Sequence, residues 1–303
     1  PHLPEMPPTD LIPPTSQLIG GGFANRTIAM RKELVEKGQG QPGFPSEIGE
    51  EAVERGLRWI AAHQFPDGAW RFNHAREDGP CKGLCDAPGD ASSNTAATGL
   101  AILSFLGAGY SHVEGPYKKN VSDGLYYLLR HGEKTEHGID LQQGTMYGQG
   151  IATLALCETY AMTKDPGLKE FAQGAIDFIV YAQNPDDGGW RYDPLQPGDT
   201  TVTGWQFMAL KSAEMAGLHV ERSVIYKADR FLTSVQLEDG ARYGYQSASP
   251  RRTTTAIGLL CRMYLGWGPT MEPINRGVTY LDQWGPSQTN IYYNYYATLV
   301  LHH

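Results

Sequence analysis

The sequence contains little charge, few cysteines and no long hydrophobic run. Charged residues make up 19% of the 303 residues, and the net charge of −8 comes with no long basic segment. This charge pattern argues against an extended nucleic-acid-binding surface. The longest apolar stretch, around Ala96–Gly109, is too short for a transmembrane helix and is interrupted by glycine. No signal-peptide pattern is visible, but the chain begins at Pro1, so we expect that a preceding segment was removed.

The four cysteines include one close pair, Cys81 and Cys85, in the loop GPCKGLCD. We favour a disulfide that braces this loop, which would indicate an exported or periplasmic protein. Zinc binding with His74 or Asp86 is an alternative, although the spacing differs from the usual two-residue gap. Two reduced thiols are the third possibility. We expect no metal ion and no cofactor, and the cellular location otherwise remains open.

Two regions differ in composition. Residues 1–49 begin with a segment rich in Pro and Gly, which predicts an extended arm, with one possible helix near Ala24–Lys37. Residues 50–303 contain a repeated pattern, and with 41% hydrophobic residues the chain can bury a large core. We therefore expect the folded domain to cover residues 50–303.

The repeated pattern is a small residue, an aromatic residue, an aliphatic residue, a glutamine five positions after the aromatic one, then Asp-Gly and another aromatic. It occurs in Arg55–Trp70, Gln173–Trp190 and Lys227–Tyr245, with weaker copies in Asp123–Gly138 and Arg276–Pro286. The apolar spacing of these segments predicts amphipathic helices.

A more uniformly apolar segment follows each copy. These segments are Asn94–Leu106, Met146–Tyr160, Thr201–Ala213, Arg252–Tyr264 and Tyr292–His303. Gly99, Gly150, Gly204 and Ala256 share one register, at intervals of 51, 54 and 52 residues. The unit is therefore about 50 residues, a helical hairpin whose second helix is buried on most sides. Stacking such hairpins predicts an inner and an outer layer of helices.

The links from each amphipathic helix to the next apolar helix are long, and the return links are mostly shorter. The long links are Arg71–Ser93, Glu133–Thr145, Arg191–Thr200 and Ala241–Arg251. In an alternating array they all emerge at one end, where the apolar helices also begin. We call this end the long-loop face and expect any binding site there, because loops carry function and helix N-termini favour anions.

The repeated frame resembles the QW motif of squalene–hopene cyclases and related triterpene cyclases, whose superfamily includes protein prenyltransferases. The residues that carry the resemblance are Gln64 with Trp70, Gln183 with Trp190, and Gln236, which no tryptophan follows. The resemblance implies an all-α, α/α toroid, usually of six inner and six outer helices, in which these Gln and Trp residues tie adjacent outer helices together. We count about five pairs, so we expect a C-terminally truncated or open ring.

The chemical motifs of the superfamily are missing. Hopene-type cyclases use an Asp-rich D-x-D-D motif, and in this chain only Asp199 falls at the matching position. Asp199 is a helix cap or, alternatively, an acid that protonates an alkene. The zinc triad of protein prenyltransferases and the Cys of complement-type thioesters cannot be placed either.

Aromatic and basic residues at the starts of the apolar helices are candidate ligand contacts. The candidates are Tyr147, Trp205, Tyr293 and Tyr296 for an aromatic cavity, and Arg251 and Arg252 for a diphosphate or carboxylate. Core packing and surface ion pairs are the competing interpretations.

Asp186 and Asp187 look like a paired-carboxylate active site. However, Asp187-Gly188 has counterparts at Asp67-Gly68 and Asp239-Gly240. A turn is needed in every repeat, whereas a catalytic pair is needed once, so these acids indicate turns.

We expect a repeat domain that binds a ligand or polypeptide at the long-loop face. The partner would be a hydrophobic or isoprenoid-like small molecule or a polypeptide, with no nucleic acid and no transmembrane segment. A terpenoid cyclase with Asp199 as its acid, and a carbohydrate-active toroid, remain as alternatives.

Overall fold

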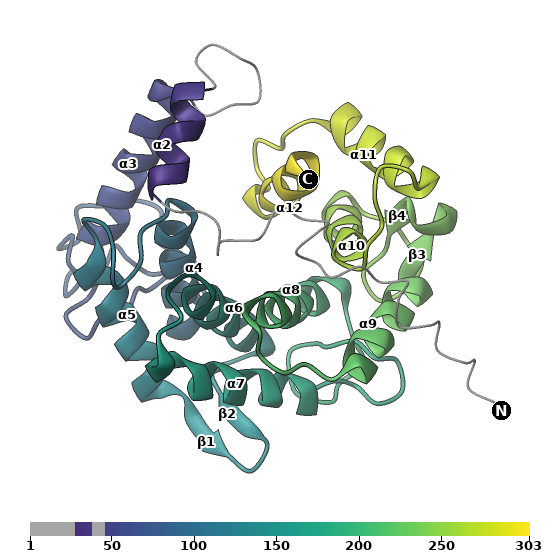
Figure 1. The fold of residues 1–303 in the computed structure, drawn as a ribbon, viewed down its shortest axis with the longest axis horizontal. Helices are drawn as coiled ribbons and strands as arrows, with labels where there is room; N and C mark the ends of the chain where they lie inside the picture. The colour runs from purple at the N-terminus through teal and green to yellow at the C-terminus, as the bar shows by residue number, and fades with distance from the viewer. Residues whose placement is uncertain (1–27, 38–45) are drawn as a thin grey trace.

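The computed structural model describes residues 28–37 and 46–303, and its helices form two concentric arcs (Figure 1). The outer arc contains α3 (Glu47–Ala62), α5 (Lys118–His131), α7 (Pro166–Tyr181), α9 (Arg222–Val235) and α11 (Glu272–Trp284). The inner arc contains α4 (Asn94–Gly107), α6 (Met146–Thr163), α8 (Thr200–Ala216), α10 (Arg252–Tyr264) and α12 (Ile291–His302). This arrangement confirms the expected α/α toroid.

The arcs remain open between α3 and α12 (Figure 1). A further helix, α2 (Ile28–Lys37), lies beside α3, where Nη2 of Arg31 meets Glu50 at 2.6 Å. The Pro-rich start of the expected arm lies outside the described residues. Within the described part of the chain, no helix is long and apolar enough to cross a membrane.

The two arcs differ in burial because their sequences differ in periodicity. In α9 the buried residues recur every three or four positions, as at Val224, Ala228 and Phe231, so one face meets the core. In α6 nearly every side chain from Met146 to Ala161 is buried. The inner helices therefore form the centre of the core, and the outer helices cover it.

The repeated glycine register positions neighbouring inner helices. A Cβ atom on Gly99 would lie 3.0 Å from Ile151 of α6, and one on Gly204 would lie 2.5 Å from Ile257 of α10. A Cβ atom on Gly150 would lie 2.6 Å from Nε2 of Gln206 in α8. Each glycine thus permits the next inner helix to approach closely, which explains why the register recurs.

The glutamines of the repeat bridge adjacent outer helices in two places. Nε2 of Gln64 donates to the carbonyl of Asn120 in α5 at 2.9 Å, and Nε2 of Gln183 donates to that of Val224 in α9 at 2.9 Å. Gln236 differs, because its Oε1 accepts a 2.8 Å hydrogen bond from Arg262 of the inner helix α10.

The tryptophans tie each turn to the outer helix that precedes it. Nε1 of Trp70 donates to the carbonyl of Ile60 at 2.7 Å, and Nε1 of Trp190 donates to that of Ile179 at 2.8 Å. Tyr243 takes this place in the third copy and accepts from Nε of Arg262 at 3.0 Å. The third turn is thus anchored by a guanidinium and not by an indole.

Short antiparallel hairpins occupy two of the links, so the fold is not purely helical. One pairs β1 (Glu133–Thr135) with β2 (Gly138–Asp140). The other pairs β3 (Gln236–Leu237) with β4 (Arg242–Tyr243) around the 3₁₀ turn η2 (Glu238–Gly240). The sequence pattern predicted plain links here, because strands of two or three residues carry too few positions for a periodicity.

Candidate functional site

Asp199 lies at the long-loop face as the N-cap of α8 and is fully buried. Its Oδ1 accepts hydrogen bonds from the backbone N–H groups of Thr201 and Val202 at 2.8 and 2.9 Å, and from the Thr201 hydroxyl at 2.6 Å. Its Oδ2 has no hydrogen bond of normal length from the described residues and lies 4.0 Å from Nε of Arg191. One carboxylate oxygen therefore caps the helix. The other makes no hydrogen bond of normal length with the described residues, although the Tyr245 hydroxyl also interacts with this carboxylate.

Three tyrosines lie near this carboxylate: Tyr147 in the first turn of α6, and Tyr192 and Tyr245 in the links before α8 and α10. The Tyr147 hydroxyl bonds to the Thr201 hydroxyl at 2.7 Å, and the hydroxyls of Tyr192 and Tyr245 lie 3.1 Å apart. We call Asp199, Arg191, Tyr147, Tyr192 and Tyr245 the tyrosine cluster. Its rim is open, since Tyr192 is 40% exposed.

Two tyrosines of the cluster hold their hydroxyl protons firmly. Burial raises the pKa of Tyr147 to about 12. Burial, together with the Tyr192 hydroxyl and the Asp199 carboxylate, raises the pKa of Tyr245 above its usual range. At neutral pH the hydroxyls of Tyr147 and Tyr245 therefore keep their protons and can donate or accept hydrogen bonds.

Trp205 does not line an open cavity. Its side chain is 3% exposed, its Nε1 donates to the Tyr292 hydroxyl at 2.9 Å, and its ring lies 5.5 Å from that of Tyr295 and 5.7 Å from that of Tyr296. Trp205 was a candidate for lining an aromatic cavity, but tyrosines of α12 pack beside its indole. Tyr296 is fully buried in the same packing.

The remaining candidates also lie apart from the cluster. Arg251 and Arg252 are exposed at the start of α10, and the Arg252 guanidinium lies over the Trp284 ring at 5.6 Å. Tyr293 is 2% exposed and faces the core. Within the described contacts, Arg251, Arg252 and Tyr293 do not reach Asp199. The sequence analysis placed them at one site because each lies near the start of an apolar helix, but their side chains point in different directions.

Sequence reasoning missed Arg191, Tyr192 and Tyr245. A signal for the two tyrosines was present, because each stands two residues after the aromatic residue that closes a turn, at Trp190 and Tyr243. Extending each repeat by two residues past its closing aromatic residue would have placed both tyrosines near the start of the next inner helix.

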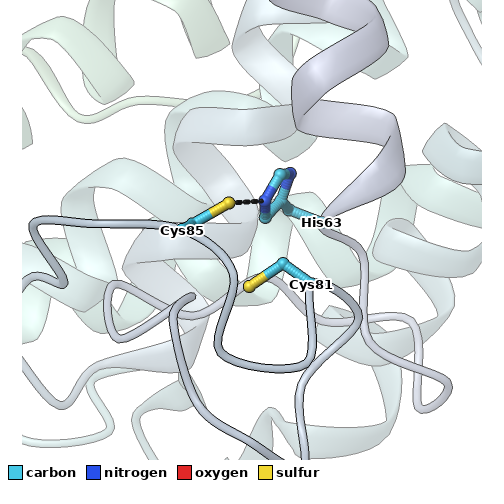
Figure 2. Close-up of side chains that lie close together, drawn as sticks. All are labelled: His63, Cys81 and Cys85. Carbon is cyan, nitrogen blue, oxygen red and sulfur yellow. Dashed lines mark hydrogen bonds between the residues drawn. The ribbon is translucent and has the colours of Figure 1, made fainter.

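Cys81 and Cys85 are free thiols, so the disulfide that the sequence analysis favoured is not formed. Both lie in the first long link, close to His63 at the end of α3 (Figure 2).

Comparisons with known proteins support the fold. No family model matches the chain. A squalene–hopene cyclase of Bradyrhizobium diazoefficiens is 24% identical over 70% of this chain and 32% of its own length. The solved structure of a family 76 glycoside hydrolase (mannosidase) of Bacteroides thetaiotaomicron matches 93% of this chain and 86% of its own, with a TM-score of 0.52 and 13% identity. The chain thus has a terpenoid cyclase-like α/α toroid fold and spans about a third of the cyclase that it resembles.

Proposed function

We propose that this chain is a binding toroid that holds a hydroxylated ligand, best fitted by a carbohydrate, at the tyrosine cluster. The supporting observation is Oδ2 of Asp199, a buried carboxylate oxygen that receives no hydrogen bond of normal length from the described residues and lies beneath the partly exposed Tyr192. A ligand hydroxyl would supply that donor, and a charge-assisted hydrogen bond is among the stronger ones. The Tyr192 ring would offer an aromatic face to the apolar side of a sugar.

The contacts of Asp199 argue for binding and against catalysis. An acid that protonates an alkene must carry a proton, whereas Asp199 accepts three hydrogen bonds at Oδ1 and faces a guanidinium. Glycoside hydrolysis usually needs two carboxyl groups across the scissile bond. No second carboxylate occurs among the contacts that the described residues make with Asp199. The fold likeness to a mannosidase is consistent with a sugar ligand, but at 13% identity it concerns architecture.

Calorimetric titration with neutral trisaccharides tests the proposal. We expect one of mannotriose, maltotriose or cellotriose to bind without being cleaved. Tyr192→Ala should weaken that binding by about tenfold, the value of one aromatic contact. Tyr126→Ala removes another exposed tyrosine, 59% exposed against 40% for Tyr192, from the outer helix α5 and should leave the affinity unchanged. Absence of binding across the panel, or equal affinities for wild type and Tyr192→Ala, would contradict the proposal.

A terpenoid cyclase is the second candidate, and the sequence similarity to the squalene–hopene cyclase favours it. It predicts turnover of squalene that Asp199→Asn abolishes. Incubation of the wild-type chain with squalene, followed by gas chromatography, distinguishes the two: cyclic products would replace the binding proposal with an enzymatic one.

A further inference from the structure

A histidine and two cysteines meet at the edge of the first repeat, in the link that follows α3 (Figure 2). Nε2 of His63 and the sulfurs of Cys81 and Cys85 all lie within 4.8 Å of one another. Nε2 of His63 is 3.1 Å from Sγ of Cys85. Ligands of one tetrahedral zinc ion lie roughly 3.5–3.8 Å apart, so a shift of about 1 Å would bring all three onto a single ion.

The His63 ring is held in the orientation that metal binding requires. Its Nδ1 lies 2.6 Å from the carbonyl oxygen of Trp59, which can only accept, so Nδ1 carries the proton and Nε2 presents a lone pair. The indole of Trp59 stacks on the imidazole, with centroids 3.8 Å apart. A histidine that binds a metal through one nitrogen usually donates from the other in this manner.

The backbone between the cysteines makes a tight turn, and the two sulfurs lie within 4.8 Å of each other. Lys82 and Gly83 have φ angles of 50° and 77°, two consecutive left-handed residues that reverse the chain. The N–H of Leu84 donates to the Cys81 carbonyl at 3.0 Å and closes the turn. A disulfide would not need the oriented imidazole, and a cysteine nucleophile would need one sulfur and not two.

His74 stands beside this group. Its ring lies edge-on to that of His63 at 5.7 Å, and its Nδ1 is 3.1 Å from the Phe72 carbonyl oxygen, so its Nε2 is the nitrogen left to bind. Sγ of Cys81 donates to the His74 carbonyl at 3.1 Å, which joins the two ends of the site.

We propose that His63, Cys81 and Cys85 bind a zinc ion, with His74 as the fourth ligand. Two thiolates and imidazole nitrogen are a donor set that suits Zn²⁺. Binding forms two Zn–S and two Zn–N bonds, and each thiol releases its proton to solvent. The ion would fix the long link between α3 and α4 at the long-loop face. This proposal replaces our expectation that the chain holds no metal, and it does not depend on the ligand at the tyrosine cluster.

Zinc titration of the reduced, metal-stripped chain tests the site. We expect one zinc ion per chain to remain after gel filtration, and cobalt in its place to give a thiolate-to-metal charge-transfer absorption. Cys81→Ser, Cys85→Ser and His63→Ala should each weaken zinc binding by more than about 100-fold, and His74→Ala by at least about tenfold. Cys157→Ala and Cys261→Ala remove buried thiols of α6 and α10 and should bind zinc as wild type does.

Circular dichroism of each variant shows whether the fold is intact, and the cobalt spectrum of the wild type reports sulfur ligation even where a variant unfolds. Failure of the reduced wild-type chain to retain more zinc than the Cys81→Ser, Cys85→Ser double variant would overturn the site. A mass two hydrogens below that of the reduced chain, with no zinc bound after reduction, would assign a disulfide instead. Unchanged zinc affinity in His74→Ala would overturn the fourth ligand.

Discussion

Asp187 stabilises the turn of the second repeat with both carboxylate oxygens. Oδ1 accepts from the N–H of Gly189 at 2.7 Å, and Oδ2 accepts from that of Gly198 at 2.8 Å. Asp187→Asn would turn an amide N–H toward one of these donors, so we expect it to lower the free energy of unfolding by about 1–3 kcal/mol. Asp186 is exposed, and Asp186→Asn should change stability by less than about 0.5 kcal/mol. Urea denaturation of both variants measures the difference; equal stabilities would contradict the assignment of Asp187 as a turn residue.

The role of a single residue could be predicted from the sequence where the same residue recurs in each repeat. It could not be predicted where the role depends on a contact between segments far apart in the chain. Asp187 was predicted as a turn residue because its Asp-Gly recurs. His63 was not singled out, since its approach to Cys85 depends on how a long link folds back across the end of α3. Trp205 was misplaced because an apolar helix start gives no sign of which neighbour will cover it.

At the scale of the helix, the inner arc depends on glycine at the contact between neighbours. Gly204→Ala would place a methyl group 2.5 Å from Ile257, so we expect a loss of about 1–3 kcal/mol in the free energy of unfolding. A Cβ atom on Gly56 of α3 would have no neighbouring atom within 4 Å, and Gly56→Ala should raise stability by about 0.5–1 kcal/mol. Thermal unfolding of the two variants distinguishes them; shifts of the same sign would show that helix propensity and not packing governs this position.

The order and pairing of the helices could be read from periodicity, because burial on one face or on all faces leaves different patterns. The repeat begins at Arg55, whereas the outer helix α3 begins earlier, at Glu47. The first turns of α3 are exposed, so the repeated apolar pattern does not extend to them and could not predict where the helix begins. The hairpins β1–β2 and β3–β4 were not predicted. Such short strands of two or three residues form because of where the two helices that the link connects begin and end, and the sequence pattern does not show this.

At the scale of the whole molecule, the buried thiols link stability to pH. Burial raises the pKa of Cys261 from 9.0 to about 12, and it raises that of Cys157 as well. The folded state therefore keeps protons that the unfolded state releases above pH 9, and this contribution to stability is lost as pH rises toward about 12. Each thiol costs up to about 1.4 kcal/mol per pH unit in that window.

Urea unfolding at about pH 8 and about pH 10.5, on either side of the ordinary thiol pKa, measures this loss. Wild type should lose stability over the interval, and Cys261→Ala should lose less, because one of the titrating groups is gone. Equal slopes in the two proteins would contradict the assignment of the effect to the Cys261 thiol.

The central claim, that the tyrosine cluster is where this toroid binds its ligand, is tested most directly by fluorine NMR of the chain labelled with 3-fluorotyrosine. Single Tyr→Phe variants assign the resonances, and the three trisaccharides are the probes. We expect one trisaccharide to shift the signals of Tyr192, Tyr245 and Tyr147 while those of Tyr126 and Tyr280, on outer helices, stay in place. Cluster signals that do not move with any trisaccharide, or shifts confined to the outer helices, would contradict the claim.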